Sequence, residues 1–91
     1  MTSQLSSVDI KKLVQTEKIV IGTEKTLKCL KSGKLKLVIL SNNCPERIEK
    51  SVQHYSTIGE IEVNKVKYPN DELGVICKKP FSISVLGILK N

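Results

Sequence analysis

The sequence predicts a mixed α/β protein, a three-layer α/β/α sandwich with a mixed four-stranded sheet. Two observations support this. Short apolar runs typical of strands alternate with amphipathic helical segments along the whole chain. Residues 37–40 are four consecutive apolar residues, which is typical of a strand that is buried on both faces and covered by helices on each side. The 91 residues contain no linker or repeat, so we expect one domain spanning residues 1–91, with residues 1–6 flexible.

The N-terminal third predicts a helix, a strand and a second helix. Ser6 or Ser7 can cap a first helix that reaches about Thr16, in which residues 10, 13 and 14 form an apolar stripe at helical spacing. Residues 19–21 are a short β-branched strand. A second helix follows Gly22 and runs to about Ser32, and Gly33 is a good left-handed terminator. The outer face of this helix is rich in lysine.

The middle of the chain predicts the central strand and the longest helix. The strand covers residues 36–40. Pro45 fits the first helical position, where its missing N–H costs nothing, which leaves Cys44 as the cap. The helix is expected to run to about Ile58 and to end at Gly59.

The last third predicts an edge strand, a short helix and a final strand. Ile61 and Val63 alternate with polar residues, as in a strand with one wet face. Asn70 is expected to cap a helix that Pro80 stops. Gly74 inside this helix costs about 1 kcal/mol against alanine, so a close approach has to justify it. The final strand is expected over residues 81–89. The order of the strands does not follow from these patterns.

Composition narrows the class of function. The formal net charge is +6, and fourteen of the fifteen basic residues are lysine. Such a surface favours polyanions, either nucleic acid or acidic lipid, although a lysine-rich surface without a partner is the simpler alternative. There is no apolar run of membrane-spanning length and no signal-peptide pattern, so we expect a soluble, cytoplasmic protein that binds no membrane.

Catalytic, metal and cofactor chemistry is not indicated. The three cysteines, Cys29, Cys44 and Cys77, are widely spaced and are expected to be reduced thiols rather than metal ligands. The one histidine, His54, is predicted on the solvent side of its helix, away from the apolar stripe. No phosphate-binding glycine signature is present. We therefore expect no enzyme, no metal and no cofactor.

Three loops are candidates for contact with nucleic acid. A helix is expected to begin directly after Gly22, and its first turn, with Thr23 and Lys25, offers free N–H groups to a phosphate. The alternative is that Gly22 only makes the turn. The amides of Asn42 and Asn43 can read a base edge, or can be ordinary loop residues. Because Cys44 is expected at the cap, Asn43 is less obviously used by the local structure.

The third loop contains Phe81, which follows two lysines and a proline. An exposed aromatic ring beside lysines is a stacking platform for a base, although a phenylalanine at the start of a strand is often part of the core. All three loops join strands and helices, so they could share one edge of the sheet.

The chain resembles the large-subunit ribosomal protein L thirty-e family of archaea and eukaryotes, whose wider group binds kink-turn RNA. The resemblance spans about residues 8–90. It rests on Ile21-Gly22 followed by Lys25-Thr26-Leu27-Lys28, on Gly33-Lys34-Leu35-Lys36-Leu37-Val38-Ile39-Leu40, on Asn42-Asn43-Cys44-Pro45, on Glu72-Leu73-Gly74, and on the final strand.

The resemblance implies a non-catalytic constituent of the large ribosomal subunit that docks one sheet edge on a kink-turn of ribosomal RNA. It implies neighbouring ribosomal proteins as partners and a monomer when free. The family's glycine turn, second-loop asparagine and last-loop aromatic residue imply an RNA-binding set in this chain: Gly22, Thr23, Lys25, Lys28, Asn42, Asn43, Arg47, Phe81, Ser82 and Ile83.

Three departures from the family pattern stand out. Glu24 lies where relatives usually carry a basic or neutral polar residue, Arg47 is only close to a family basic position, and the chain ends at Asn91. The alternatives are a kink-turn protein of another ribonucleoprotein or of decoding, a small RNA-processing enzyme, and a protein-interaction module.

Overall fold

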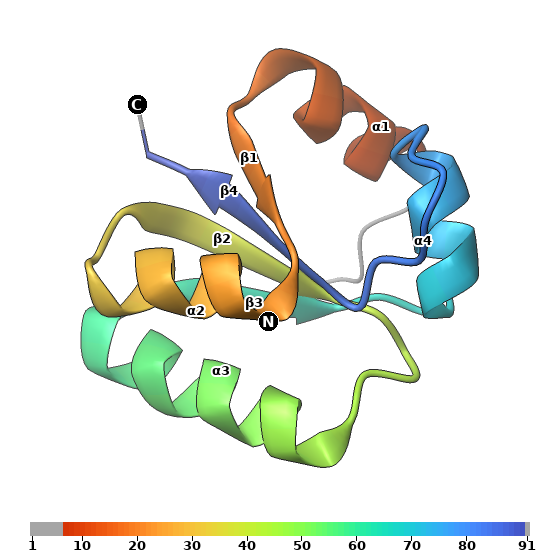
Figure 1. The fold of residues 1–91 in the computed structure, drawn as a ribbon. Helices are drawn as coiled ribbons and strands as arrows, with labels where there is room; N and C mark the ends of the chain where they lie inside the picture. The colour runs from red at the N-terminus through yellow and green to blue at the C-terminus, as the bar shows by residue number, and fades with distance from the viewer. Residues whose placement is uncertain (1–6, 91) are drawn as a thin grey trace.

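The computed structural model describes residues 7–90, in which four helices and four strands alternate (Figure 1). The expectations for residues 1–6 and for Asn91 lie outside this range. The elements are α1 (Ser7–Thr16), β1 (Ile19–Ile21), α2 (Thr23–Lys31), β2 (Leu35–Leu40), α3 (Glu46–Gly59), β3 (Glu62–Lys65), α4 (Asn70–Ile76) and β4 (Val85–Leu89).

The sheet has the strand order β1-β4-β2-β3. β4 runs antiparallel to both β1 and β2, whereas β2 and β3 are parallel. The carboxyl ends of β1, β2 and β3 therefore lie at the same edge as the start of β4. We call the connecting residues at this edge, 22–23, 41–45, 66–69 and 81–84, the rim. The predicted mixed sheet is confirmed, and β3 is an edge strand as expected.

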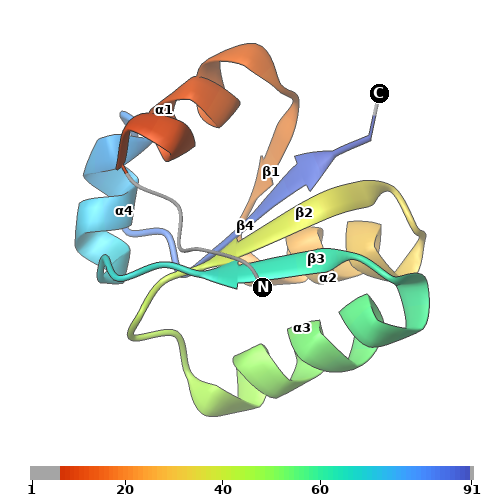
Figure 2. The same ribbon diagram turned by 180° about the vertical axis from the view of Figure 1, so that it is seen from behind.

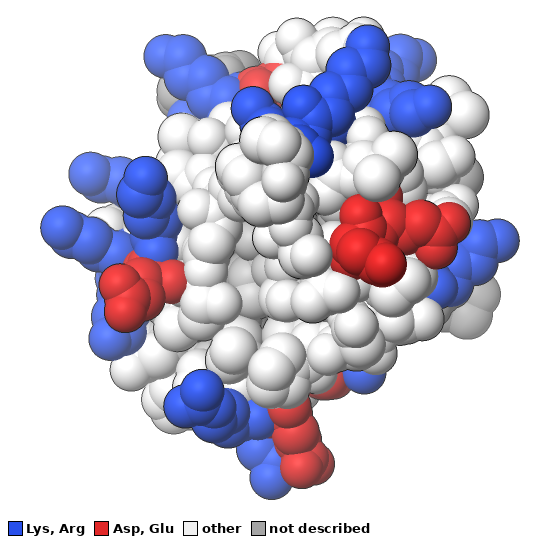
Figure 3. Space-filling model, turned by 45° about the vertical axis from the view of Figure 1, so that its right-hand side comes forward, with Lys and Arg blue, Asp and Glu red and all other residues white. Residues whose placement is uncertain are grey.

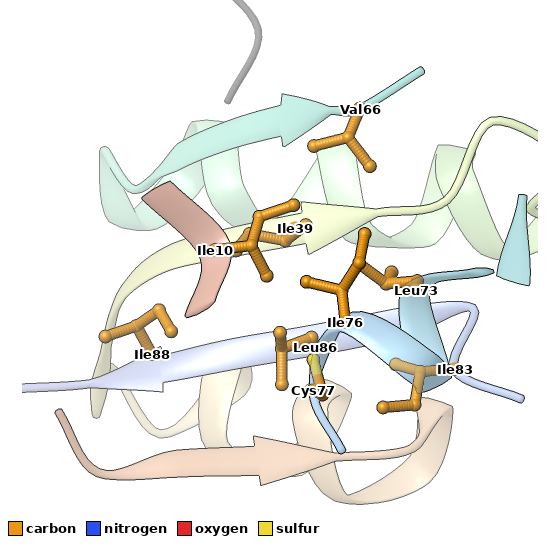
Figure 4. Close-up of a cluster of buried hydrophobic side chains, with 9 residues drawn as sticks. All are labelled: Ile10, Ile39, Val66, Leu73, Ile76, Cys77, Ile83, Leu86 and Ile88. Carbon is orange, nitrogen blue, oxygen red and sulfur yellow. The ribbon is translucent and has the colours of Figure 1, made fainter. Parts of the chain in front are cut away.

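Helices cover both faces of the sheet, as Figures 1 and 2 show from opposite sides. α1 and α4 pack on one face and α2 and α3 on the other, which confirms the three-layer sandwich. One core lies under α1 and α4 (Figure 4) and consists of Ile10, Ile39, Val66, Leu73, Ile76, Cys77, Ile83, Leu86 and Ile88. The second lies under α2 and α3 and consists of Leu30, Leu35, Val38, Leu40, Cys44, Val52, Ile61 and Val85. β2 contributes side chains to both cores, as its apolar run predicts.

The boundaries of α3 differ from the prediction at both ends. Pro45 is the cap rather than the first helical residue, since its ψ is 140° and its carbonyl accepts from the N–H groups of Ile48 and Glu49. At the other end Gly59 is helical, and Glu60 adopts the left-handed conformation at φ 55°. The Ile61 N–H donates to the Ser56 carbonyl at 2.8 Å, and the Ile61 side chain is buried. Burial of an isoleucine, worth about 1.5–3 kcal/mol, offsets the strain at Glu60.

The C-terminal third corrects three further expectations. Asn70 is the first residue of α4, and Pro69 is the cap. β4 begins at Val85, so residues 81–84 form a loop. Asn64, expected on the wet face of β3, is 4% exposed, and Val66, two residues further along, belongs to the core under α1 and α4.

Gly74 is required by a close backbone approach. A Cβ atom at this position would lie 2.0 Å from the carbonyl oxygen of Phe81. The Lys79 N–H also donates to the Gly74 carbonyl at 2.9 Å. Because glycine has no Cβ, the loop that contains Phe81 can pack directly on α4, and this contact justifies the cost of a glycine inside a helix.

Candidate nucleic-acid interface

The turn at Gly22 is open to the solvent. Gly22 caps α2 with φ 104° and ψ 150°, a conformation that L side chains rarely adopt. Its N–H donates to the Val85 carbonyl at 3.1 Å, which ties the turn to the start of β4. No heavy atom lies within 4 Å of the position a Cβ would take. The backbone is therefore held in place while the space above it stays free.

Phe81 projects from the loop between α4 and β4. Its side chain is 52% exposed, so the core alternative for this ring is wrong. Ser82 is exposed beside it, whereas Ile83 is 1% exposed and belongs to the core under α1 and α4. The structure thus gives Ile83 an anchoring position in this loop and leaves the ring of Phe81 at the surface.

The Gly22 turn and the Phe81 loop line one groove, with a volume of about 790 Å³. The predicted contacts that it contains are Gly22, Thr23, Lys25, Phe81, Ser82 and Ile83. Lys79 also lines it and was not among the predicted contacts. The sequence could have indicated Lys79 as a contact, because it lies two residues before Phe81. The groove offers exposed ammonium groups and one aromatic ring, the elements needed to hold phosphates and a stacked base.

Asn43 is held in a network of hydrogen bonds, so the local structure uses its amide more than the sequence indicated. Its Oδ1 accepts from the Ser41 hydroxyl and from the N–H of Asn70, both at 3.0 Å. Its Nδ2 donates to Asn70 Oδ1 at 3.2 Å. The Asn43 side chain therefore satisfies the first N–H of α4 from a different loop, although the residue remains exposed.

Asn70 links the second loop to the third. Besides its bonds to Asn43, its Nδ2 donates to the Ser84 hydroxyl at 3.4 Å, and its carbonyl accepts from the Ile83 N–H at 3.0 Å. The sequence presented Asn70 only as a helix cap. Its bridging role depends on residues far along the chain, so no local pattern reveals it.

Asn42 is held on the other side of the second loop. Its N–H donates to the Tyr68 carbonyl at 2.9 Å and its Nδ2 to the Lys67 carbonyl at 2.8 Å. The bonds of the two asparagines join the second loop to the segment before α4. The amide pair is therefore presented in one orientation, which recognition of a base edge requires.

Charged residues of both signs surround the groove. Figure 3 shows a largely uncharged strip with groups of basic side chains above, beside and below it, and with acidic side chains among them. Glu24, Asp71 and Glu72 are exposed. Lys28 and Arg47 are exposed on α2 and α3 but do not line the groove. The surface around the groove thus combines positive and negative groups rather than being uniformly basic.

Cys44 adds no charge to the rim at neutral pH. Burial raises the pKa of its thiol, and Glu49 adds to this effect while Lys65 opposes it. Its Sγ donates to the Pro45 carbonyl at 3.8 Å. Cys29, Cys44 and Cys77 are all free thiols, as expected.

Within residues 7–90, no three His, Cys, Asp or Glu side chains are grouped so that they could hold a metal ion. None of the described helices has the length and apolar character needed to cross a membrane. His54 is exposed on α3, as predicted.

Comparison with known proteins identifies similar sequences and folds. The profile described as "Ribosomal protein L7Ae/L30e/S12e/Gadd45 family" matches residues 6–91. The large ribosomal subunit protein eL30 of Sulfolobus acidocaldarius is 37% identical over 87 residues, which cover 96% of this chain and 84% of the relative. The protein of the same name from Methanocaldococcus jannaschii is 38% identical over 80 residues, which cover 88% of this chain and 73% of the relative.

Two solved structures share the fold. A protein of unknown function from Bacillus halodurans superposes with a TM-score of 0.79 at 22% identity, over 89% of this chain and 80% of the other. The 15.5kD RNA binding protein of Giardia lamblia superposes with a TM-score of 0.73 at 21% identity, over 90% of this chain and 68% of the other.

Proposed function

Because the chain belongs to the ribosomal protein L7Ae/L30e/S12e/Gadd45 family, we propose that it is a constituent of the large ribosomal subunit that binds ribosomal RNA at a kink-turn. The ribosomal role comes from the eL30 relatives, to which it is 37% and 38% identical. Membership in this ribosomal protein family also supports a non-enzymatic role in translation, in the cytoplasm.

The single observation that carries the kink-turn proposal is the groove at the rim. Gly22 and Phe81 are 59 positions apart in the sequence, yet they line the same groove. An open backbone turn lies on one wall and an exposed ring on the other. A kinked internal loop of RNA exposes both a sharply bent backbone and unstacked bases, so it can present a phosphate and a base to these two walls together.

The chemistry divides between affinity and selectivity. Lys25 and Lys79 in the groove, with Lys28 and Arg47 outside it, would neutralise phosphates and make binding sensitive to salt. Phe81 would stack on an unpaired base. The oriented amides of Asn42 and Asn43 would contact base edges, since the bonds that hold Asn43 use one of the two hydrogens on its Nδ2.

The test compares a kink-turn RNA with the same RNA in which the non-canonical pairs are replaced by Watson–Crick pairs. Affinity for both is measured over a range of salt concentrations by fluorescence anisotropy. We expect tighter binding of the kink-turn RNA at every salt concentration, because only that RNA exposes the bend and the unstacked bases. Equal affinities would contradict the proposal.

A second candidate is a kink-turn protein of another ribonucleoprotein or of decoding. The fold of the Giardia lamblia RNA binding protein is compatible with it, but this likeness at 21% identity concerns the fold alone. Co-sedimentation of the tagged protein with large ribosomal subunits discriminates between the two. Neighbouring ribosomal proteins would be its further partners there, and sedimentation of the purified protein tests whether it is a monomer when free.

A further inference from the structure

The edge of the sheet opposite the rim carries a cluster of lysines that the proposed function does not use. Lys18 precedes β1, Lys34 precedes β2 and Lys90 follows β4, and the sheet topology places all three at this edge. Lys36, near the start of β2, adds a fourth. All four are exposed. We call these four residues the lysine pole; it lies at the end of the sheet where β1 and β2 begin and β4 ends (Figure 1).

Backbone hydrogen bonds hold three of these lysines side by side. The Lys90 N–H donates to the Lys34 carbonyl at 2.8 Å. The Leu89 N–H donates to the Lys18 carbonyl, also at 2.8 Å. Neighbouring strands lie about 5 Å apart, so the backbones of the three lysines lie close together at this end of the sheet. The strand register places Lys34 opposite Lys90 on one face, and Lys18, opposite Leu89, on the other. The three lysines therefore flank the strands directly and are tied to the sheet by backbone hydrogen bonds.

Most of this charge is not neutralised within the protein. Lys36 forms an ion pair with Glu17. Among residues 7–90, Lys18, Lys34 and Lys90 form no ion pair or side-chain hydrogen bond. The exposed acids at this edge, Glu60 and Glu62, lie at the start of β3, beyond β2 in the strand order.

The lysine pole is too far from the rim to hold the same bound RNA loop. β4 runs from the rim to the lysine pole, and its five residues span roughly 17 Å in an extended strand. Interactions between exposed charges are screened beyond about 8 Å at physiological salt. The pole therefore contributes little to the binding of a kink-turn in the groove, and its mutual repulsion costs stability unless an anionic partner relieves it.

We propose that the lysine pole is a second RNA-binding surface, which holds the phosphate backbone of a further RNA segment while the rim holds its own. This inference goes beyond the proposed function, which concerns the rim alone. The pole has no aromatic side chain or amide among its four members, so recognition there is of charge and not of base sequence. The protein would thereby join two segments of folded RNA.

The experiment measures binding of a second RNA to protein that already carries the first. Protein saturated with unlabelled kink-turn RNA is titrated with a fluorescent plain RNA duplex, at several salt concentrations. The variant is K18Q/K34Q/K90Q. The matched control is K11Q/K12Q/K50Q, which removes the same charge from exposed lysines on the outer faces of α1 and α3. Circular dichroism confirms that both variants are folded.

We expect the wild-type complex and the control to bind the duplex. The pole variant is expected to bind it at least about tenfold more weakly at 0.1 M salt, with a salt slope smaller by about 2–3, one unit for each phosphate that the protein no longer neutralises. Its affinity for the kink-turn RNA alone should stay within about twofold of wild type, because charges beyond the Debye length are screened.

Three results would overturn the inference: no binding of the duplex to the wild-type complex, equal weakening in both variants, or an equal fall in kink-turn affinity in the pole variant. Polyglutamate of matched charge that competes as well as RNA would also overturn it, in favour of an acidic protein partner. Failure of the proposed function would instead appear as equal affinity for the kink-turn and Watson–Crick RNAs, which is measured on the first RNA alone.

Discussion

The rim and the lysine pole lie at opposite ends of the same sheet, but they use polar groups in different ways. At the rim, the Asn43 side chain bonds to Ser41 and to Asn70 of α4, which in turn bonds to Ser84, and charged residues of both signs lie around the groove. At the pole, the positively charged side chains of Lys18, Lys34 and Lys90 have no side-chain partners among the described residues. The two proposals rest on this contrast: we propose selective recognition where the polar side chains are held in place, and recognition of charge alone where they are not.

The largest effect is expected from Gly74→Ala. Alanine gains about 1 kcal/mol in helix propensity, but its Cβ would lie 2.0 Å from the Phe81 carbonyl oxygen. The loop therefore has to move, and we expect the free energy of unfolding to fall by about 1–3 kcal/mol. Affinity for kink-turn RNA should fall at least as much as on removal of the Phe81 ring. Urea denaturation and anisotropy measure the two effects.

Gly59→Ala is the control for Gly74→Ala. Its Cβ would meet only the flexible end of the Ile61 side chain, at 3.2 Å. Kink-turn affinity of Gly59→Ala should equal that of wild type. If Gly74→Ala behaves in the same way, the packing of α4 against the Phe81 loop does not position the rim.

The next largest effect is expected from Phe81→Ala. Removal of base stacking should reduce kink-turn affinity by about 1–3 kcal/mol, while the half-exposed ring contributes little to stability. Ile58→Ala removes another exposed apolar side chain, near the C-terminal end of α3, and should leave affinity unchanged. Unchanged binding of kink-turn RNA by Phe81→Ala would exclude the stacking role.

Asn43→Asp separates the structural and recognition roles of the second loop. The carboxylate keeps an acceptor for Ser41 and for the Asn70 N–H, and a negative charge at the start of α4 is favourable. These contributions are offset by the loss of the Nδ2 donor to Asn70 Oδ1, which a carboxylate oxygen would repel, so the urea midpoint should fall, but by less than in Asn43→Ala. RNA affinity should fall by about 1–3 kcal/mol, because the amide donor is removed and phosphates are repelled. Asn43→Ala should lower stability by about 1 kcal/mol.

The smallest effect is expected from Lys28→Ala, which lies outside the groove. All RNAs should bind slightly more weakly and to a similar extent, and the slope of log affinity against log salt should fall by about 1. Lys11→Ala on α1 is the matched control and should change neither quantity. A weakening confined to the kink-turn RNA would move Lys28 into the selective part of the site.

Much of the fold follows from local patterns in the sequence. The apolar run at 37–40, the stripe at residues 10, 13 and 14, and the left-handed turn at Gly33 predict elements close to those observed. The errors lie at boundaries that depend on contacts from elsewhere. Glu60 adopts the left-handed conformation because Ile61 is buried in the core. Phe81 lies in a loop because the backbone packs on Gly74.

The sequence by itself determined the alternation of helices and strands, the basic composition and the residue types in the three loops, because these depend on side chains that are close in the chain. Only the tertiary structure decided that β4 inserts between β1 and β2. That order brings the Gly22 turn and the Phe81 loop to one groove and collects Lys18, Lys34 and Lys90 at the other end. Strand order is decided by pairing between distant segments, so neither edge can be recognised from local periodicity.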